Sequence, residues 1–332
     1  MKNAIDFTVP FSGFAGTTFL NCITSAYMFL ENIPGDQQEK YFFLFGTMCG
    51  HTSLRFRYDG EPTEMEKKIC VRDFYDCGGD WAMEFLFGFA GYDYGQMINP
   101  ADFKDEIISS VNAGKPVIVG TKAEADQYRV IIGYDGDKLL SPKYTNAQRP
   151  PENPPSYDDI EVLYVFGGKI PPRFGLADGL KRIVQVMEYN INENLWGTYI
   201  DKFSSYHPTS DSFINADAEN KKARMNRLQK SMWDVMNTHN FCEVFRNCYH
   251  DDLRDPALDE LRNKIGGPYY GYTHDLSAAL ITLADQADWS HYYAHFYGEM
   301  IELTLSQISK NDAGVLETVK QIIEVLDKKQ GV

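Results

Sequence analysis

The first hydrophobic pattern along the chain has the period of a helix. Ile23, Ala26 and Leu30 recur at helical spacing after Asn21, and a Pro-Gly pair ends the pattern. The segment that follows, residues 41–60, is apolar at first and then alternates between apolar and polar positions. We therefore expect a helix that begins near Asn21, then a buried segment and then a strand.

The clearest helix signal is the segment INPADFKDEIISSVNAGKP, residues 98–116. Asn99 is a suitable N-cap, and Pro100 suits the first turn because its missing N–H would have no partner there. A glycine and a proline end the segment. Apolar residues form one buried stripe along this predicted helix: Phe103, Ile107 and Val111.

Strand signals come next. Residues 116–120, 128–142 and 159–168 are rich in β-branched and aromatic residues, and an Asp-Gly pair marks a turn within the second of these segments. The proline-rich segment 146–159 is expected to be a long surface loop of the same domain. The Gly- and Tyr-rich segment 87–95 predicts turn-rich packing, with an aromatic loop that lines a cleft as the alternative.

Helical periodicity dominates the rest of the chain. The change of pattern near residue 172 predicts an α+β domain, residues 1–172, followed by an all-α domain, residues 173–332. Four segments carry the helical pattern: 175–188, 219–250, 275–308 and 311–329.

Composition excludes several classes of function. The formal net charge is −15, and such a surface repels a phosphate backbone, so nucleic acid is not an expected partner. The first residues lack the apolar core of a signal peptide, and no run approaches the length of a transmembrane helix. Six cysteines in 332 residues are too few for a disulfide scaffold, so we expect a cytoplasmic protein with free thiols. No glycine-rich phosphate motif is present, and we expect no cofactor.

Cys22 is the first candidate for chemistry, because it lies where the first helix is predicted to begin. A thiol there faces unpaired N–H groups and the positive end of the helix dipole, and both favour the thiolate. The alternative is one more core cysteine, since free cysteine is among the most buried residue types. Asn21 and nearby main-chain N–H groups can donate to an oxyanion or simply cap the helix.

Several short motifs share their order and spacing with a known family. NCITSAYMFLENIPG, LFGTMCG, AGKPVIVG and QYRVIIGYDGDKLLSP resemble the N-terminal papain-like domain of the butirosin-biosynthesis protein H family. GLADGLKRIVQVME and DLSAALITLADQADWSHYYAHFYGEM resemble the helical domain that follows in that family. The resemblance implies a papain-like, cysteine-protease-type α+β domain before an all-α domain. It also implies acyl transfer from a carrier-protein thioester to an amine through a cysteine, here Cys22.

Two positions depart from the pattern of that family. The strand before Gly-Tyr-Asp carries a histidine near its start in the family, whereas this chain has Gln127 and Tyr128 there. A later strand often ends in Asp-Pro, whereas this chain has Ser141-Pro142. The paired loss indicates a triad that has decayed or been replaced. General-base help contributes about 10²–10⁴-fold in rate, so its loss matters.

Other histidines offer weaker substitutes for the base. His51 would have to fold back onto Cys22, and a turn histidine after a buried segment is the simpler interpretation. Folding can also bring in a histidine from the helical domain: His207, His250 or His274.

Two clusters raise the question of a metal. His291, His295 and Glu299 would share one helix face, but no third ligand from elsewhere is evident, and we expect no metal. A second group has no zinc-site spacing and predicts core thiols instead: His239, Cys242, Cys248 and His250.

Two functional hypotheses follow. The first is cysteine-dependent acyl transfer, from thioester to amine, or related amide or thioester chemistry in small-molecule or peptide biosynthesis. Cys22 is then the nucleophile, Asn21 an oxyanion donor, and Gln127 or Tyr128 occupies the place of the base; an acyl carrier protein or a small-molecule amine is the partner. The second is a catalytically decayed papain-like protein that binds a peptide, ligand or carrier protein in the same cleft.

Overall fold

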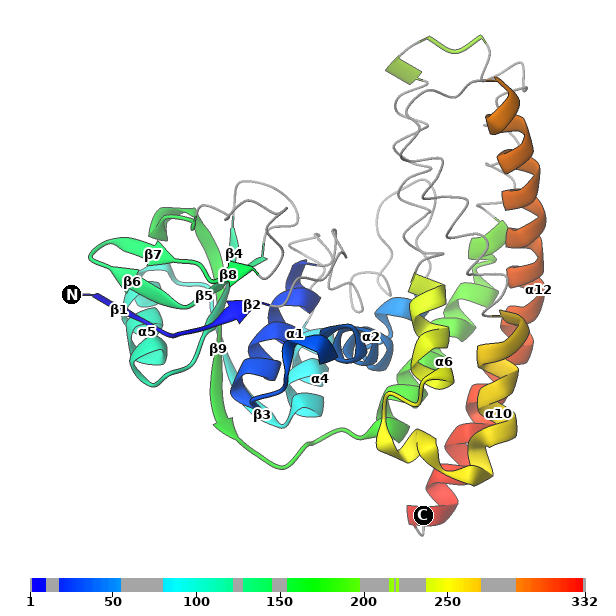
Figure 1. Cartoon of the computed structure of the whole chain (residues 1–332), viewed down its shortest axis with the longest axis horizontal. Helices are drawn as coiled ribbons and strands as arrows, with labels where there is room; N and C mark the ends of the chain where they lie inside the picture. Colours follow the sequence, from blue (N-terminus) through cyan, green and yellow to red (C-terminus); the bar gives the residue numbers. More distant parts are fainter. Residues whose placement is uncertain are drawn as a thin grey trace. The chain divides into compact units, whose positions relative to one another are not determined.

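The computed structural model of the chain describes residues 2–9, 18–54, 80–121, 128–144, 154–197, 215–217, 219–220, 237–269 and 291–330 (Figure 1). Helices and antiparallel sheets occur together in these residues, so the predicted mixed α+β class is confirmed. The chain divides into two compact units, Met1–Phe45 with Lys67–Gly175 and Gly46–Glu66 with Leu176–Val332. The domain bounds 1–172 and 173–332 stay a prediction. The sequence pattern gave no sign that a segment of the second unit lies within the first half of the chain.

A four-stranded antiparallel sheet in the order β3-β9-β4-β5 forms the centre of the first unit. Its strands are β3 (Tyr92–Met97), β9 (Ile160–Lys169), β4 (Val117–Thr121) and β5 (Tyr128–Ile131). The register sets Gly120 opposite both Tyr128 and Val162. Because successive side chains alternate between the faces of a sheet, these three residues share one face.

Helix α5 (Pro100–Asn112) covers the other face of the sheet. Its predicted stripe is confirmed, because Phe103, Ile107 and Val111 form one buried cluster with sheet residues that include Val119 and Leu163. The predicted cap is also confirmed. The Asn99 side chain accepts a hydrogen bond of 3.3 Å from the Ala101 N–H.

Helices α1 (Thr18–Leu30) and α4 (Asp80–Ala90) belong to the face that carries Tyr128. Helix α1 contacts β4 and β5, and the Phe87 ring of α4 stacks 4.4 Å from Tyr94 of β3. The first unit therefore has a layer of helix on each face of the sheet (Figure 1).

The prediction of turns throughout residues 87–95 is wrong. Helix α4 runs to Ala90, and β3 starts at Tyr92. Gly88 lies in the last turn of the helix. Glycine is needed there because a Cβ would lie 2.7 Å from the Phe174 ring. Only Gly91, with a φ of +75°, makes a turn that needs glycine. Gly88 is therefore a glycine required by close packing. The local sequence alone does not distinguish such a glycine from one that forms a turn.

Two smaller sheets use the remaining strands. β1 (Lys2–Ala4), β6 (Gly133–Asp135) and β7 (Lys138–Leu140) form an antiparallel sheet, and β2 (Thr8–Val9) pairs in parallel with β8 (Lys143–Tyr144). The predicted Asp-Gly turn is confirmed between β6 and β7, where Gly136 has a φ of +63°. Most of the predicted loop 146–159 lies outside the described residues, and its end forms η3 (Tyr157–Asp159).

The apolar segment after the first helix is itself helical. After η1 (Gly35–Gln37), α2 (Gln38–Met48) leads into η2 (His51–Ser53). The strand predicted for the end of the 41–60 segment lies outside the described residues. Residues of η2 and its flank contact α6 (Leu176–Asn192): Arg182 donates to the Cys49 carbonyl at 3.3 Å, and Asn190 donates to the Ser53 carbonyl at 2.6 Å. These bonds explain why this segment belongs to the second unit.

The other described elements of the second unit are helical. They are residues 237–246, η4 (Asp251–Arg254), η5 (Pro256–Leu258), α10 (Asp259–Lys264), η6 (Ile265–Tyr269) and α12 (His291–Gln330). The described part of the predicted helical segment 275–308 and the segment 311–329 belong to one continuous helix, α12. Asn311 donates to the Gln307 carbonyl at 2.7 Å, and buried Asp312 accepts from the Trp196 indole. Both polar side chains are therefore hydrogen-bonded while their backbone stays helical. No helix among the described residues is both long and apolar enough to span a membrane.

Glu31 ties the end of α1 to two strands of the sheet. Its carboxylate accepts from the Tyr92 hydroxyl at 2.7 Å and from the Lys169 ammonium at 2.6 Å. Partial burial alone would raise the pKa of Glu31, but the hydrogen bonds from Lys169 and Tyr92 outweigh it and hold this pKa below its ordinary value. Burial and the bond to Glu31 raise the pKa of Tyr92.

Replacing Glu31 by Gln should lower the free energy of unfolding at pH 7 by about 1 kcal/mol, because a charge-assisted pair of bonds is lost. The pKa of Glu31 is lower in the folded state, so its stabilisation is present above the ordinary value of 4.5 and disappears as the pH falls through the folded-state value. Urea unfolding of both proteins from pH 3 to 8 checks this. Exposed Glu161→Gln is the control, and a difference between wild type and Glu31→Gln that does not shrink as the pH falls below 4.5 would contradict the assignment.

Candidate functional site

Cys22 lies one helical turn inside α1. The helix starts at Thr18, three residues before Asn21, near which the sequence placed its start. The unpaired N–H groups of a helix belong to its first four residues, here 18–21, and the dipole effect falls off within the first turn. The helix terminus therefore stabilises the thiolate of Cys22 less than the sequence indicated.

The thiol is also largely covered by protein. Cys22 is 8% exposed and forms no disulfide, whereas neighbouring Asn21 is half-buried. Asn21, Cys22 and Ser25 share one face of α1 because residues three and four apart are neighbours on a helix. We call these three residues the Cys22 face. Helical spacing continues this face to Phe29, whose ring lies 4.7 Å from that of Phe7.

Tyr128 opens β5 on the sheet face that α1 contacts. Its ring lies edge-on to Phe19 at 4.9 Å, and Phe19 is likewise edge-on to Tyr164 at 5.3 Å. Glycine at position 120 leaves room for this ring, because a Cβ there would lie 3.0 Å from Tyr128 Cε1. Tyr128 is thus a packed aromatic residue. A phenol is also a much poorer base than an imidazole near neutral pH.

Other predicted positions of the triad carry no charge in the structure. Ser141 follows β7, and its Oγ is buried with no hydrogen-bond partner in the described part of the chain. Gln127 lies outside the described residues. The structure therefore brings the helix of Cys22 against the strand of Tyr128, and neither described position of the predicted triad partners carries an imidazole or a carboxylate.

The described histidines lie in separate environments. His51 is fully buried in the second unit, near Cys49, whose thiol pKa burial raises to about 11. The His250 ring accepts from the Asp252 N–H at 3.2 Å and caps η4, and His239 lies 3.6 Å from Glu243. His207 and His274 lie outside the described residues.

The two metal interpretations gain no support. No group of three or more His, Cys, Asp and Glu side chains suited to a metal occurs in the portion that the structure describes. The backbone at His291, His295 and Glu299 is helical, but these side chains lie outside the described ones.

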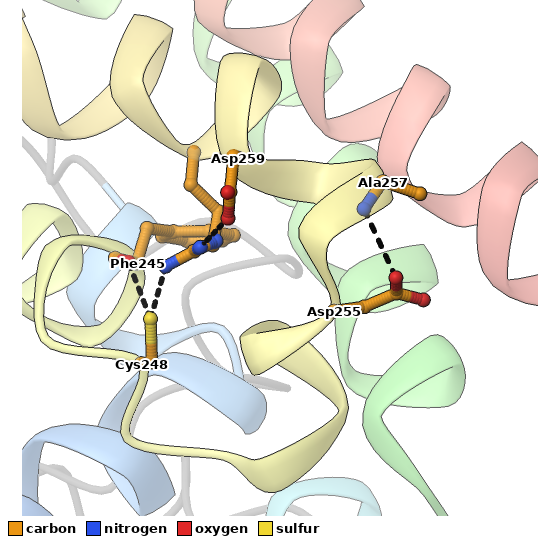
Figure 2. Close-up of polar contacts among 6 residues, drawn as sticks. Phe245, Cys248, Asp255, Ala257 and Asp259 are labelled. Atoms are coloured by element: carbon orange, nitrogen blue, oxygen red, sulfur yellow. Dashed lines mark hydrogen bonds and ion pairs between the residues drawn. The ribbon is translucent and has the colours of Figure 1, made fainter.

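The cysteines of the second cluster have separate environments. Cys242 is fully buried, which agrees with the predicted core thiol. Cys248 is half-buried and has a left-handed backbone, with a φ of +51°. Its sulfur lies beside the Phe245 carbonyl (Figure 2), and Arg262, which also bonds Asp259, donates to it.

No protein-family model and no curated protein matches this chain. Function is therefore inferred from the residues of the Cys22 face and from the packing of Tyr128.

Replacing Gly120 by Ala should lower the free energy of unfolding by about 2 kcal/mol, because the new methyl group overpacks the sheet face. It would lie 2.8 Å from Val162 Cγ1 and 3.0 Å from Tyr128 Cε1. Gly168→Ala is a matched control, since its Cβ would meet nothing within 4 Å. Urea unfolding that shows equal stabilities for the two variants would contradict the packing described for Tyr128.

Proposed function

We propose that the first unit is a papain-like domain that has lost catalysis, and that it binds a peptide, a small-molecule ligand or a carrier protein at the Cys22 face. The observation that carries this proposal is the packing of Tyr128 against Phe19 and Tyr164. A tightly packed phenol stands where the resemblance to the butirosin-biosynthesis protein H family implies a base.

The arrangement of elements supports the papain-like part of the proposal. Helix α1, helix α5 and then strands β4 and β5 follow in the order that the resemblance implies. Helix α1 contacts β4 and β5, while α5 packs on the opposite face of the same sheet. Cys22 and Tyr128 therefore stand on two elements in contact.

Three features support the loss of turnover. Tyr128 offers a phenol in place of an imidazole, Ser141 offers a hydroxyl in place of a carboxylate, and Cys22 lies one turn away from the helix terminus. A base contributes about 10²–10⁴-fold to such chemistry, and the helix dipole alone does not replace it. Binding needs neither group, so it is the function that survives these changes.

A second candidate function is cysteine-dependent acyl transfer. The half-buried amide of Asn21 favours it, because this side chain carries a donor group in the first turn of α1, next to Cys22 in the sequence. Cys22 would attack a thioester carbonyl and release the donor thiol, and an amine would then take the acyl group. Gln127 and Tyr128 would line the place of the base, and a cytoplasmic carrier protein or small amine would be the partner.

The two candidates differ in the fate of a thioester. We expect acetyl-pantetheine, the thioester arm that a carrier protein presents, to bind wild type and Cys22→Ala with dissociation constants that agree within about twofold, since binding does not use the thiol. We also expect no acetyl group on Cys22. Ligand-observed NMR gives the affinity, and peptide mass spectrometry gives the modification.

Cys49→Ala is the control for any general effect of removing a thiol. Rapid acetylation of Cys22 with release of pantetheine would favour acyl transfer and contradict the loss of catalysis. Absence of saturable binding to both proteins up to millimolar concentrations would contradict a thioester-binding function.

A further inference from the structure

Ser25 is a buried hydroxyl that the fold does not use. It is 1% exposed, and its Oγ has no hydrogen-bond partner in the described chain. Serine within a helix commonly bonds to the carbonyl four residues earlier, and buried polar groups almost always have a partner. Its neighbour Thr24, which is fully buried, has the same property.

The two hydroxyls point in different directions. At about 100° per residue, Ser25 lies about 60° from Cys22 around the helix axis, while Thr24 lies about 160° away. Side chains on a helix also lean toward its N-terminus, so Ser25 leans toward the turn that holds Cys22. Ser25 is therefore directed toward the thiol, and Thr24 serves as a natural comparison.

The chemistry of the Cys22 face favours a ligand with an acceptor oxygen. The hydroxyl of Ser25 is able to donate, and it lies three residues from Cys22 on the same side of α1. A carbonyl oxygen of an acyl or amide group fits such a hydroxyl donor, whereas a cationic group does not.

We infer that Ser25 is a ligand-binding residue whose hydroxyl donates a hydrogen bond to a carbonyl oxygen of an acyl or peptide ligand held against Cys22. This inference rests on the proposed function, because it names the part of the ligand that the Cys22 face recognises. It does not require turnover. It gives a role to a buried hydroxyl that neither the sequence motifs nor the fold explains.

A pair of alkylating reagents tests the inference. Iodoacetamide carries a carbonyl, and allyl iodide has no hydrogen-bond acceptor of comparable strength. In both reactions the Cys22 thiolate displaces iodide and forms a carbon–sulfur bond, and buffer takes the thiol proton. Peptide mass spectrometry gives the rate at Cys22 in wild type, Ser25→Ala and Thr24→Val.

We expect Ser25→Ala to slow alkylation by iodoacetamide about three- to tenfold, the range of one neutral hydrogen bond, and to leave the rate with allyl iodide unchanged. Thr24→Val should change neither rate. Ser25→Thr keeps the hydroxyl and should retain the wild-type ratio of the two rates. Thermal unfolding checks that each variant is folded, and removal of a buried hydroxyl with no partner should not lower the melting temperature.

Equal changes with both reagents, or no change with either, would overturn the role of Ser25 and leave the proposed binding function in place. A wild-type Cys22 that reacts with neither reagent would mean that the Cys22 face is closed to ligands. That result would overturn the proposed function as well, so the two failures are distinguishable.

Discussion

The contact between the rings of Phe19 and Tyr128 joins the candidate site to the fold. Phe19 lies three residues before Cys22 and packs edge-on against Tyr128 and Tyr164, so the helix that bears the thiol is fixed to two strands of the central sheet. Gly120 leaves the space for Tyr128, and Glu31 anchors the far end of the same helix. The position of the Cys22 face depends on these contacts.

The same contact limits the chemistry that the site can perform. A ring that packs well against two aromatic neighbours stabilises the unit, but it also occupies the start of β5 with a group that does not take a proton near neutral pH. A phenol in this place favours packing over proton transfer. The Ser25 hydroxyl keeps a donor on the Cys22 face, which is what the proposed recognition of a carbonyl group requires.

Local signals predicted the parts of the fold that local chemistry controls. The cap at Asn99, the stripe of α5 and the Asp-Gly turn before β7 were all foreseen, since each depends on residues close together in sequence. Helix α4 was missed because close packing against the distant Phe174 requires glycine at position 88, and a local pattern does not reveal this contact. The start of α1 and the burial of His51 likewise depend on tertiary packing. The candidate residues of the site were named from sequence, but the environment of Tyr128 and the unused hydroxyl of Ser25 needed the structure.

The lifetime of an acyl group on Cys22 tests most directly whether catalysis has been lost. The thiol can be acetylated with p-nitrophenyl acetate, and the loss of the acetyl group from the Cys22 peptide can then be followed at pH 7 with and without an added amine. The account predicts loss no faster than from acetylated N-acetylcysteine in the same buffer, because no base assists water or amine. Loss about 10²-fold faster than this reference, or rapid transfer to the amine, would reveal a working base and contradict the account.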